Sequence, residues 1–348
     1  MQTTQPASIQ VRALASIASL QNHKYLNLPL VDFQQFVTGT RRDKRVCSDA
    51  ILKGLREEGF LYLTGHGLDQ AQIDHVFQQS KWFFNLSMAE KNKLAWQSPE
   101  ANRGYVAPGR EKVSQLKDPK DVAQLRTQSP DLKESLEIGR EPSPNNYVNN
   151  WPKNPEFKKT MMEFFESAHL LHLEIMNALA LSLNLGNRFF DEFCGAKDHN
   201  LRLLHYPAVP KNLLDKDGHS RAGAHSDYGT LTLLFQDDKG GLEVKDKHTD
   251  QWVPVHPIPG TIVINAGDLL ARWANDTITS TEHRVVSPQT STADKNSYDE
   301  RYSVVFFCNP NFDAEIKVLP SCSGKTNPPR YEPVNTHRYL TERLSTTY

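Results

Sequence analysis

The sequence predicts an α+β protein in which helices and short strands precede an antiparallel β-sandwich or barrel. In residues 154–184, apolar side chains recur with the period of about 3.6 residues that marks a core-facing helix. From about residue 200 the pattern changes to short segments of period two, separated by clusters of Gly, Pro, Asn and Asp. Such segments are typical of antiparallel sandwiches and barrels. We therefore expect the β core in the second half of the chain.

Shorter elements complete this plan. Residues 48–58 and 69–84 show helical spacing, and Gly59 ends the first of these helices, where a residue free to adopt positive φ is favoured. The charged stretch 112–130 is expected to be exposed, and residues 336–344 to form a terminal helix capped by Thr336. We divide the chain into four regions. Residues 26–152 form an N-terminal region of helices and short strands, and residues 153–198 a long supporting helix with its connection. Residues 199–312 form the β core, and residues 313–348 a C-terminal tail with its helix.

Charge and composition exclude several classes of partner. Forty basic residues stand against 41 acidic ones, which gives a net charge of −1. Such a balance does not favour binding to nucleic acid or to an anionic membrane surface. The sequence also contains no run of about 18 apolar residues that could span a bilayer. We expect a small, neutral or weakly charged partner molecule, and the sequence leaves the oligomeric state open.

Cysteine usage bears on the compartment. Four cysteines lie far apart in the sequence and form no C-x-x-C pair: Cys47, Cys194, Cys308 and Cys322. Free, buried thiols in a reducing compartment are expected, and hence a cytoplasmic protein. The first acidic residue is Asp32, and whether the acid-free stretch before it is a targeting segment is left open.

A histidine and a carboxylate stand two residues apart in His225-Ser-Asp227, at the mouth of an alternating strand. This spacing places both side chains on one face, as a metal-binding pair requires. The third ligand should lie on another strand, and the best candidate is His283. Two imidazoles and one carboxylate leave positions open on an iron ion, as in non-haem iron oxygenases. A closed structural zinc site would need a fourth protein ligand.

Two further histidines, His169 and His172, lie three residues apart on the long predicted helix. This spacing could form a metal pair, but no acidic or cysteine partner stands at ligand spacing nearby. We expect His169 to be solvated and His172 to be packed. His66, in a glycine-flanked turn, is expected to form structural hydrogen bonds.

Arg301 and Ser303 follow His283 on the next strand-like segment. Residues two apart on a strand share a face. A guanidinium and a hydroxyl together form a suitable clamp for a carboxylate in a partly dry pocket. The sequence therefore predicts an open metal site with a carboxylate receptor close to it.

The order of the motifs H-x-D, a distant H and then R-x-S on strands resembles that of the 2-oxoglutarate and Fe(II) dependent dioxygenases. The segments around Asp32, Gly59 and Tyr206 resemble the isopenicillin-N-synthase-like branch of this family. The resemblance covers the chain from about residue 26 to its end. It implies a double-stranded β-helix (jelly-roll) core flanked by α-helices, with Fe(II), the cosubstrate 2-oxoglutarate and O2 as cofactors.

The resemblance also assigns roles to the candidate residues. It makes His225, Asp227 and His283 the catalytic iron ligands. Arg301 and Ser303 would bind the distal carboxylate of 2-oxoglutarate, and Tyr206 would assist. Two positions depart from the family pattern: Ser226 stands where relatives usually have threonine, and Leu204 where many plant members have asparagine.

Several longer strings are similar to the fungal thymine 7-hydroxylases, at residues 100–115, 201–209, 265–273 and 343–348. The similarity implies hydroxylation of the thymine methyl group to 5-hydroxymethyluracil, with further oxidation to 5-formyluracil and 5-carboxyuracil open. A flat pyrimidine needs an aromatic face and a few polar groups at its edge. Arg202 and Phe307 match positions that hold the base in these enzymes. Tyr228 and Phe235 are further candidates, and core packing is an equal alternative for Phe235.

Two other functions stay open at this point. The same chemistry, with release of succinate and CO2, could act on another small metabolite of fungal secondary metabolism, such as an alkaloid, a terpenoid or an amino acid derivative. A non-catalytic member that only binds its ligands is the other alternative. The intact set of ligands and clamp residues argues against it.

Overall fold

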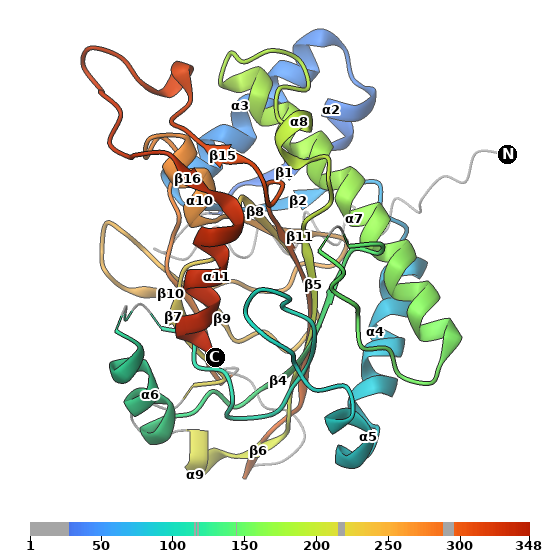
Figure 1. Cartoon of the computed structure of the whole chain (residues 1–348). Helices are drawn as coiled ribbons and strands as arrows, with labels where there is room; N and C mark the ends of the chain where they lie inside the picture. Colours follow the sequence, from blue (N-terminus) through green and yellow to red (C-terminus); the bar gives the residue numbers. More distant parts are fainter. Residues whose placement is uncertain (1–27, 115, 117, 144, 215–219, 288–295) are drawn as a thin grey trace, which may run out of the picture.

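The computed structural model describes residues 28–348 except 115, 117, 144, 215–219 and 288–295 (Figure 1). The acid-free N-terminal stretch up to residue 27 lies outside the described residues. An eight-stranded sheet runs through the centre in the order β1-β2-β11-β8-β14-β5-β4-β3, and its neighbouring strands are antiparallel except for the β1–β2 pair. Its strands are β1 Leu30–Asp32, β2 Phe60–Thr64, β3 Gly104–Val106, β4 Glu134–Gly139, β5 Asn200–Tyr206, β8 Leu231–Gln236, β11 Ile262–Ala266 and β14 Arg301–Cys308.

A four-stranded sheet of order β10-β9-β12-β7 packs on one face of the large sheet. Its strands are β7 Ala222–His225, β9 Leu242–Lys245, β10 Trp252–Pro254 and β12 His283–Val285. An apolar cluster that includes Tyr62, Tyr206, Val244, Val285 and Val305 joins the two sheets. This is the jelly-roll core that the resemblance implies, and it agrees with the antiparallel sandwich or barrel that the residue pattern predicts. Two small strand pairs, β6 Val209–Pro210 with β13 Ser297–Tyr298 and β15 Glu315–Ile316 with β16 Val334–Asn335, lie outside it.

Helices cover the other face of the large sheet and form the main apolar core with it. The longest, α7 Pro155–Ser182, confirms the predicted helix at 154–184 and packs against α3 and α4 (Figure 1). The side chain of Asn154 accepts hydrogen bonds from the first free N–H groups of α7, which fixes its start. The other helices are α2 Gln34–Thr38, α3 Arg41–Glu57, α4 Gln70–Phe84, α5 Met88–Asn92, α6 Pro119–Gln128, α8 Asp191–Cys194, α9 Lys211–Leu214, α10 Asp268–Trp273, α11 Thr336–Thr347 and the 3-10 helix η1 Pro320–Cys322.

Strand alternation sorts side chains between the two cores, and this decides which of them can reach a site between the sheets. On β8, Leu233 and Phe235 belong to the helix-side core, whereas Leu234 faces the small sheet. On β14, Phe306 is on the helix side, and Phe307 packs against the cluster between the sheets. Phe307 and Phe235 therefore point in opposite directions from the large sheet.

Three expectations for individual elements are wrong. The first helix starts at Arg41 rather than near residue 48, because Thr40 and Asp43 form a reciprocal capping box there. The stretch 112–130 is not simply exposed, since Lys112 is buried and α6 forms within it. The terminal helix is capped by the side chain of Asn335, which accepts from the Arg338 N–H, and not by Thr336.

Two other expectations hold, for the cysteines and for His66. The four cysteines are free and buried. His66 forms a structural hydrogen bond, in which its Nδ1 accepts from the backbone N–H of Leu68 at 3.2 Å. Among the described helices, none combines the length and the apolar character needed to cross a bilayer.

Candidate metal centre and adjoining cavity

The structure brings the three predicted metal ligands together. His225 ends β7, His283 begins β12, and the two residues are cross-strand partners with ring centroids 4.3 Å apart. The Asp227 Oδ1 atom lies 3.9 Å from Nε2 of His225 and 3.7 Å from Nε2 of His283. One ligand atom from each residue falls within 4.8 Å of the other two. This is the spacing of side chains that converge on one ion.

Backbone carbonyls set the tautomer of both histidines. Nδ1 of His225 lies 2.7 Å from the Gly223 carbonyl oxygen, and Nδ1 of His283 lies 3.2 Å from that of Thr281. A carbonyl only accepts hydrogen bonds, so each Nδ1 carries the proton and each Nε2 presents a lone pair. Ligand histidines are commonly oriented through their second nitrogen in this way.

The carboxylate of Asp227 is held from behind. Its Oδ2 atom accepts hydrogen bonds from Thr232 Oγ1 at 2.6 Å and from Asn265 Nδ2 at 2.7 Å. The Oδ1 atom is thereby left to face the two imidazoles. Thr232 and Asn265 come from neighbouring strands, β8 and β11, where they are register partners.

The string at 265–273 explains how the loop after Asp227 is fixed. Within it, residues 268–273 form α10. The N–H groups of Asp268 and Leu269 at its start donate to the carbonyls of Asp227 and Tyr228, at 2.8 and 3.1 Å. A Cβ on Gly267 would lie 2.5 Å from the Gly229 carbonyl oxygen. The close approach of the two segments therefore requires glycine.

The charge state of the group suits a divalent cation. Burial, with the neighbouring His283, lowers the pKa of His225 to about 3, so this imidazole is neutral. Burial raises the pKa of Asp227, but His283, His225 and the two donors behind it outweigh burial and lower the pKa overall. Metal binding needs a neutral imidazole and an ionised carboxylate. Two nitrogen donors and one oxygen donor fit Fe(II) and leave coordination positions open.

A second histidine group, His169, His172 and His199, lies between α7 and the large sheet, but hydrogen bonds use the lone pairs of His169 and His199. His199 Nδ1 accepts from the Asn309 N–H at 3.0 Å, so His199 Nε2 donates to Nδ1 of His169 at 2.9 Å. His172 is packed, as predicted. His169 is not solvated but buried, because it forms this bond beneath α7.

The predicted carboxylate clamp also assembles. Arg301 and Tyr206 are cross-strand partners on β14 and β5, and the Arg301 guanidinium lies 4.9 Å from the centre of the Tyr206 ring. Arg301 donates to Ser303 Oγ at 3.2 Å and to Gln236 Oε1 at 3.4 Å. Leu204, the departure noted in the sequence, packs in the apolar cluster between the sheets. All three predicted clamp residues are buried in the same barrel as the metal ligands.

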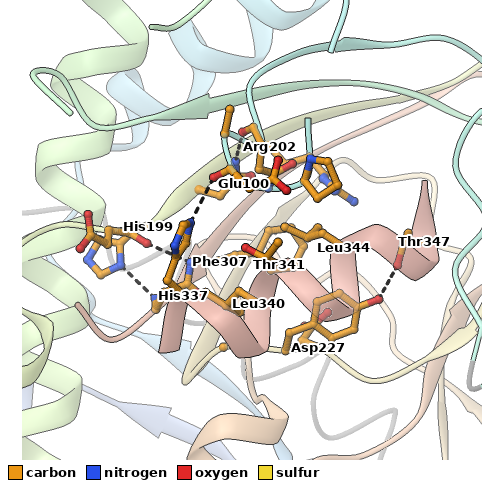
Figure 2. Close-up of a pocket in the computed structure, with 18 of the residues that line it drawn as sticks. Glu100, His199, Arg202, Asp227, Phe307, His337, Leu340, Thr341, Leu344 and Thr347 are labelled. Atoms are coloured by element: carbon orange, nitrogen blue, oxygen red, sulfur yellow. Dashed lines mark hydrogen bonds between the residues drawn. The ribbon is translucent and has the colours of Figure 1, made fainter. Parts of the chain in front are cut away.

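A cavity opens beside His225 and Asp227, and Figure 2 shows its walls. Arg202 and Phe307 form one side, and Leu340, Thr341 and Leu344 of α11 lie across from them. Tyr228 is also part of the lining, and its hydroxyl shares a hydrogen bond of 2.8 Å with Thr347 Oγ1. Three of the four predicted substrate residues therefore meet at one cavity. The role of α11 in closing it was not predicted.

Phe235, the fourth predicted substrate residue, does not line this cavity. Its ring packs edge to face on Phe164 of α7, with centroids 5.1 Å apart, in the helix-side core. The parity of β8 points it away from the space between the sheets. Core packing, the alternative left open by the sequence, is its role.

Arg202 is held by a set of partners that sequence reasoning missed. Its Nε and one terminal nitrogen pair with Glu137 at 2.8 Å and Glu111 at 3.0 Å, and the other terminal nitrogen donates to Tyr348 Oη at 2.8 Å. The guanidinium also lies 5.2 Å from the centre of the Phe307 ring. Burial lowers the pKa of Arg202, but Glu111 and Glu137 raise it well above its ordinary value. The cavity is therefore lined by the planar guanidinium of Arg202, whose positive charge is already balanced by Glu111 and Glu137.

Comparisons with known proteins agree with this architecture. The model of the 2OG-Fe(II) oxygenase superfamily matches residues 197–310, and a model described as non-haem dioxygenase in morphine synthesis N-terminal matches residues 28–154. Among solved structures, the thymine 7-hydroxylase of Neurospora crassa in complex with alpha-KG and thymine is 44% identical, with a TM-score of 0.85, over 94% of this chain and 99% of that chain.

Curated relatives carry other names. The 2-oxoglutarate-Fe(II) type oxidoreductase ppzD of Metarhizium majus is 36% identical over 335 residues, which cover 91% of this chain and 94% of the relative. The proline hydroxylase buaE of Petromyces alliaceus is 33% identical over 326 residues, which cover 91% and 98%. Overall architecture is thus shared among proteins named for different substrates.

Proposed function

Because this chain belongs to the 2OG-Fe(II) oxygenase superfamily and is a 2-oxoglutarate-dependent dioxygenase, we propose that its substrate is thymine, hydroxylated on the methyl group. The product is 5-hydroxymethyluracil, and the same site can repeat the oxidation to 5-formyluracil and 5-carboxyuracil. The observation that carries the proposal is the pairing of Arg202 with Phe307 beside the iron ligands, in a cavity where the charge of Arg202 is already balanced.

Chemical complementarity supports a neutral, flat ligand. Phe307 supplies an aromatic face. Arg202 uses three of its N–H groups on Glu137, Glu111 and Tyr348, which leaves one N–H on each terminal nitrogen for a ring carbonyl. An anionic substrate would compete with Glu111, a partner that stays ionised, since Arg202 and Lys133 hold its pKa at about 2 against the effect of burial. A pyrimidine base carries no charge and meets these conditions.

The solved relative with thymine bound adds independent support, since it is 44% identical over nearly its whole length. Another solved structure of the same Neurospora crassa enzyme holds alpha-KG and 5-formyluracil, at 40% identity. The strings at 100–115, 201–209 and 343–348 also contribute Glu111, Arg202 and Tyr348, and the Arg202 guanidinium donates hydrogen bonds to both Glu111 and Tyr348.

Iron and 2-oxoglutarate supply the oxidation: one atom of O2 enters succinate as 2-oxoglutarate loses CO2, and the other enters a substrate C–H bond. His225, Asp227 and His283 would hold the metal. Arg301, Ser303 and Tyr206 would hold the cosubstrate, and Arg202 with Phe307 would bind the base beside the metal site. Leu340 and Leu344 of α11 cover the cavity and exclude water (Figure 2).

The test is a substrate panel with the purified protein, Fe(II) and 2-oxoglutarate. Succinate and oxidised product are measured for thymine, uracil, thymidine and free proline. Thymine should stimulate succinate release and yield 5-hydroxymethyluracil, and uracil, which lacks the methyl group, should yield no such product. If thymine gives no turnover while another compound does, the substrate assignment is wrong.

A second candidate rests on the curated relatives, which include a proline hydroxylase. In that case the same site would oxidise another small metabolite. Free proline would have to place its carboxylate near Glu111 and Glu137, or bind elsewhere in the cavity. Turnover of proline in the panel, without turnover of thymine, would favour this candidate.

The free thiols support a location in the cytoplasm. Cell fractionation of the full-length chain tests this. Recovery in the mitochondrial fraction would contradict it.

A further inference from the structure

Arg221 stands immediately before β7, four residues from His225, and has no role in the assignments above. Its side chain is completely buried. One terminal nitrogen donates to the carbonyl oxygen of Asp299 at 2.5 Å, whereas Nε and the other terminal nitrogen have no hydrogen-bond partner among the described residues. A buried guanidinium that keeps unpaired donors is energetically unfavourable unless a ligand completes it.

Arg221 is not the only cation at this place. Its guanidinium lies 6.0 Å from the centre of the Tyr206 ring, and that of Arg301 lies 4.9 Å from the same centre. Arg301 also keeps a buried Nε without a partner among the described residues. Burial, and then repulsion by Arg301, lowers the pKa of Arg221 to about 10. Two buried cations therefore share one aromatic ring.

The nearby acids Asp237 and Asp299 act on Arg221 only from beyond ion-pair distance, and their carboxylates form hydrogen bonds with other groups. Asp237 accepts hydrogen bonds from the backbone N–H groups of Tyr302 and Lys239, at 2.6 and 3.0 Å. The carboxylate of Asp299 pairs with the ammonium of Lys239 at 3.3 Å. Within the part of the chain that the structure describes, neither Arg221 nor Arg301 has a carboxylate within ion-pair distance. Among the described residues, no anionic group completes the free donors of these two arginines.

We propose that Arg221 is a second arginine of the cosubstrate clamp and that it binds the distal carboxylate of 2-oxoglutarate together with Arg301. The Ser303 hydroxyl accepts from Arg301 and so keeps its own proton to donate to the same carboxylate. Paired guanidiniums fit a carboxylate through charge-assisted hydrogen bonds. The inference rests on the use of 2-oxoglutarate and is independent of the choice of thymine as substrate.

The test measures binding without turnover. Under anaerobic conditions, 2-oxoglutarate is titrated into the Fe(II)-loaded protein and followed by the visible absorption of the iron chelate. Pyruvate is titrated in parallel, because it has the same chelating 2-oxo acid and lacks the distal carboxylate. Arg221→Met should raise the dissociation constant of 2-oxoglutarate at least tenfold and change that of pyruvate less than twofold. Equal changes for both ligands, or no change for 2-oxoglutarate, would overturn the proposal.

Arg103→Met is a matched control. Arg103 is also buried and also has an Nε without a hydrogen-bond partner among the described residues, but it lines the cavity on the substrate side. Its replacement should leave the dissociation constant of 2-oxoglutarate unchanged. If it weakens 2-oxoglutarate as much as Arg221→Met does, the effect reflects loss of a buried arginine in general, and the clamp assignment fails.

A second variant keeps the proposal testable if Arg221→Met does not fold. In Arg301→Met, the remaining Arg221 should still make 2-oxoglutarate bind at least fivefold more tightly than pyruvate. If the two ligands bind equally in this variant, Arg301 is the only cation that senses the distal carboxylate, and Arg221 has a structural role.

Discussion

Replacement of Thr232 by valine should weaken iron binding without unfolding the protein. The Thr232 hydroxyl donates to Asp227 Oδ2 at 2.6 Å and is buried. Valine has nearly the same shape and keeps the packing on β8, but it removes one of the two donors that hold the carboxylate. Hydrogen bonds to charged groups contribute about 1.5–3 kcal/mol. At about 1.4 kcal/mol per tenfold change, this corresponds to an affinity loss of roughly 10- to 150-fold.

The assay is an anaerobic competition of the protein with a chelator for Fe(II). The range agrees with the loss of about 10- to 100-fold that is typical when a partner of a metal ligand is removed. Thr230→Val is the matched control. Its hydroxyl is also buried on the same segment, but it bonds to the Cys308 carbonyl and to His172 instead of Asp227. An iron affinity of Thr232→Val within twofold of both wild type and Thr230→Val would refute the reasoning.

Three other predictions follow from the site and its surroundings. Asp227→Ala should abolish substrate-linked succinate formation, and persistence of that activity in an anaerobically iron-loaded sample would contradict the ligand assignment. Phe307→Leu should raise KM for thymine by roughly 5- to 10-fold, because about 1 kcal/mol of ring contact is lost. Phe235→Leu should instead lower the melting temperature and leave KM unchanged. The reverse pattern would show that we have assigned Phe235 on β8 and Phe307 on β14 to the wrong faces of the sheet. Burial raises the pKa of Glu111, but Arg202 and Lys133 hold it at about 2, so the stability it contributes is present above about pH 4.5 and lost as pH falls toward 2. On acidification from pH 5 to pH 2, wild type should lose about 3 kcal/mol more unfolding free energy than Glu111→Gln. The measurement is urea unfolding at both pH values, and an equal loss of unfolding free energy in the two proteins would contradict the prediction.

The convergence of the three candidate metal ligands was predictable from their order and spacing in the sequence. His225 and Asp227 are two residues apart on a strand, and His283 lies on a later strand-like segment of the same β region. Arg301 and Ser303 are likewise two residues apart on a strand, so the sequence alone places their side chains on one face. Long apolar periodicity likewise indicated α7 within two residues at each end.

It was harder to predict which face of the large sheet each side chain points from, because this depends on how the strands pair. Phe235 and Phe307 both lie on apolar strands near the site, and only the pairing of β8 with β14 and the two cores shows that they point in opposite directions. His169 was misjudged for a related reason. Its partner, His199, is 30 residues away in the sequence, and nothing local indicates that contact.

The charged partners of Arg202 could not be predicted from the sequence either, because they too are distant from it along the chain. Glu111 and Glu137 reach Arg202 from segments 91 and 65 residues away, so no spacing rule connects them. One signal was available: the alternation at 131–140 places Lys133, Ser135 and Glu137 on one face of a strand. A polar face of this kind on a strand of a central sheet implies buried partners.

The central sheet also has a consequence for how substrate preference could be transferred between relatives. Strands β1 to β4 come from the region before α7, yet they complete the same sheet as β5 and β14, which carry Arg202 and the carboxylate clamp. Glu111 and Glu137 belong to that earlier region and Arg202 to the later one. A chimera that exchanges only the later half would bring a foreign residue to the two carboxylates, or leave them without their cation. Under the proposed role of Arg202, substrate selectivity would therefore depend on residues from both halves of the chain and would not be transferred with one half alone.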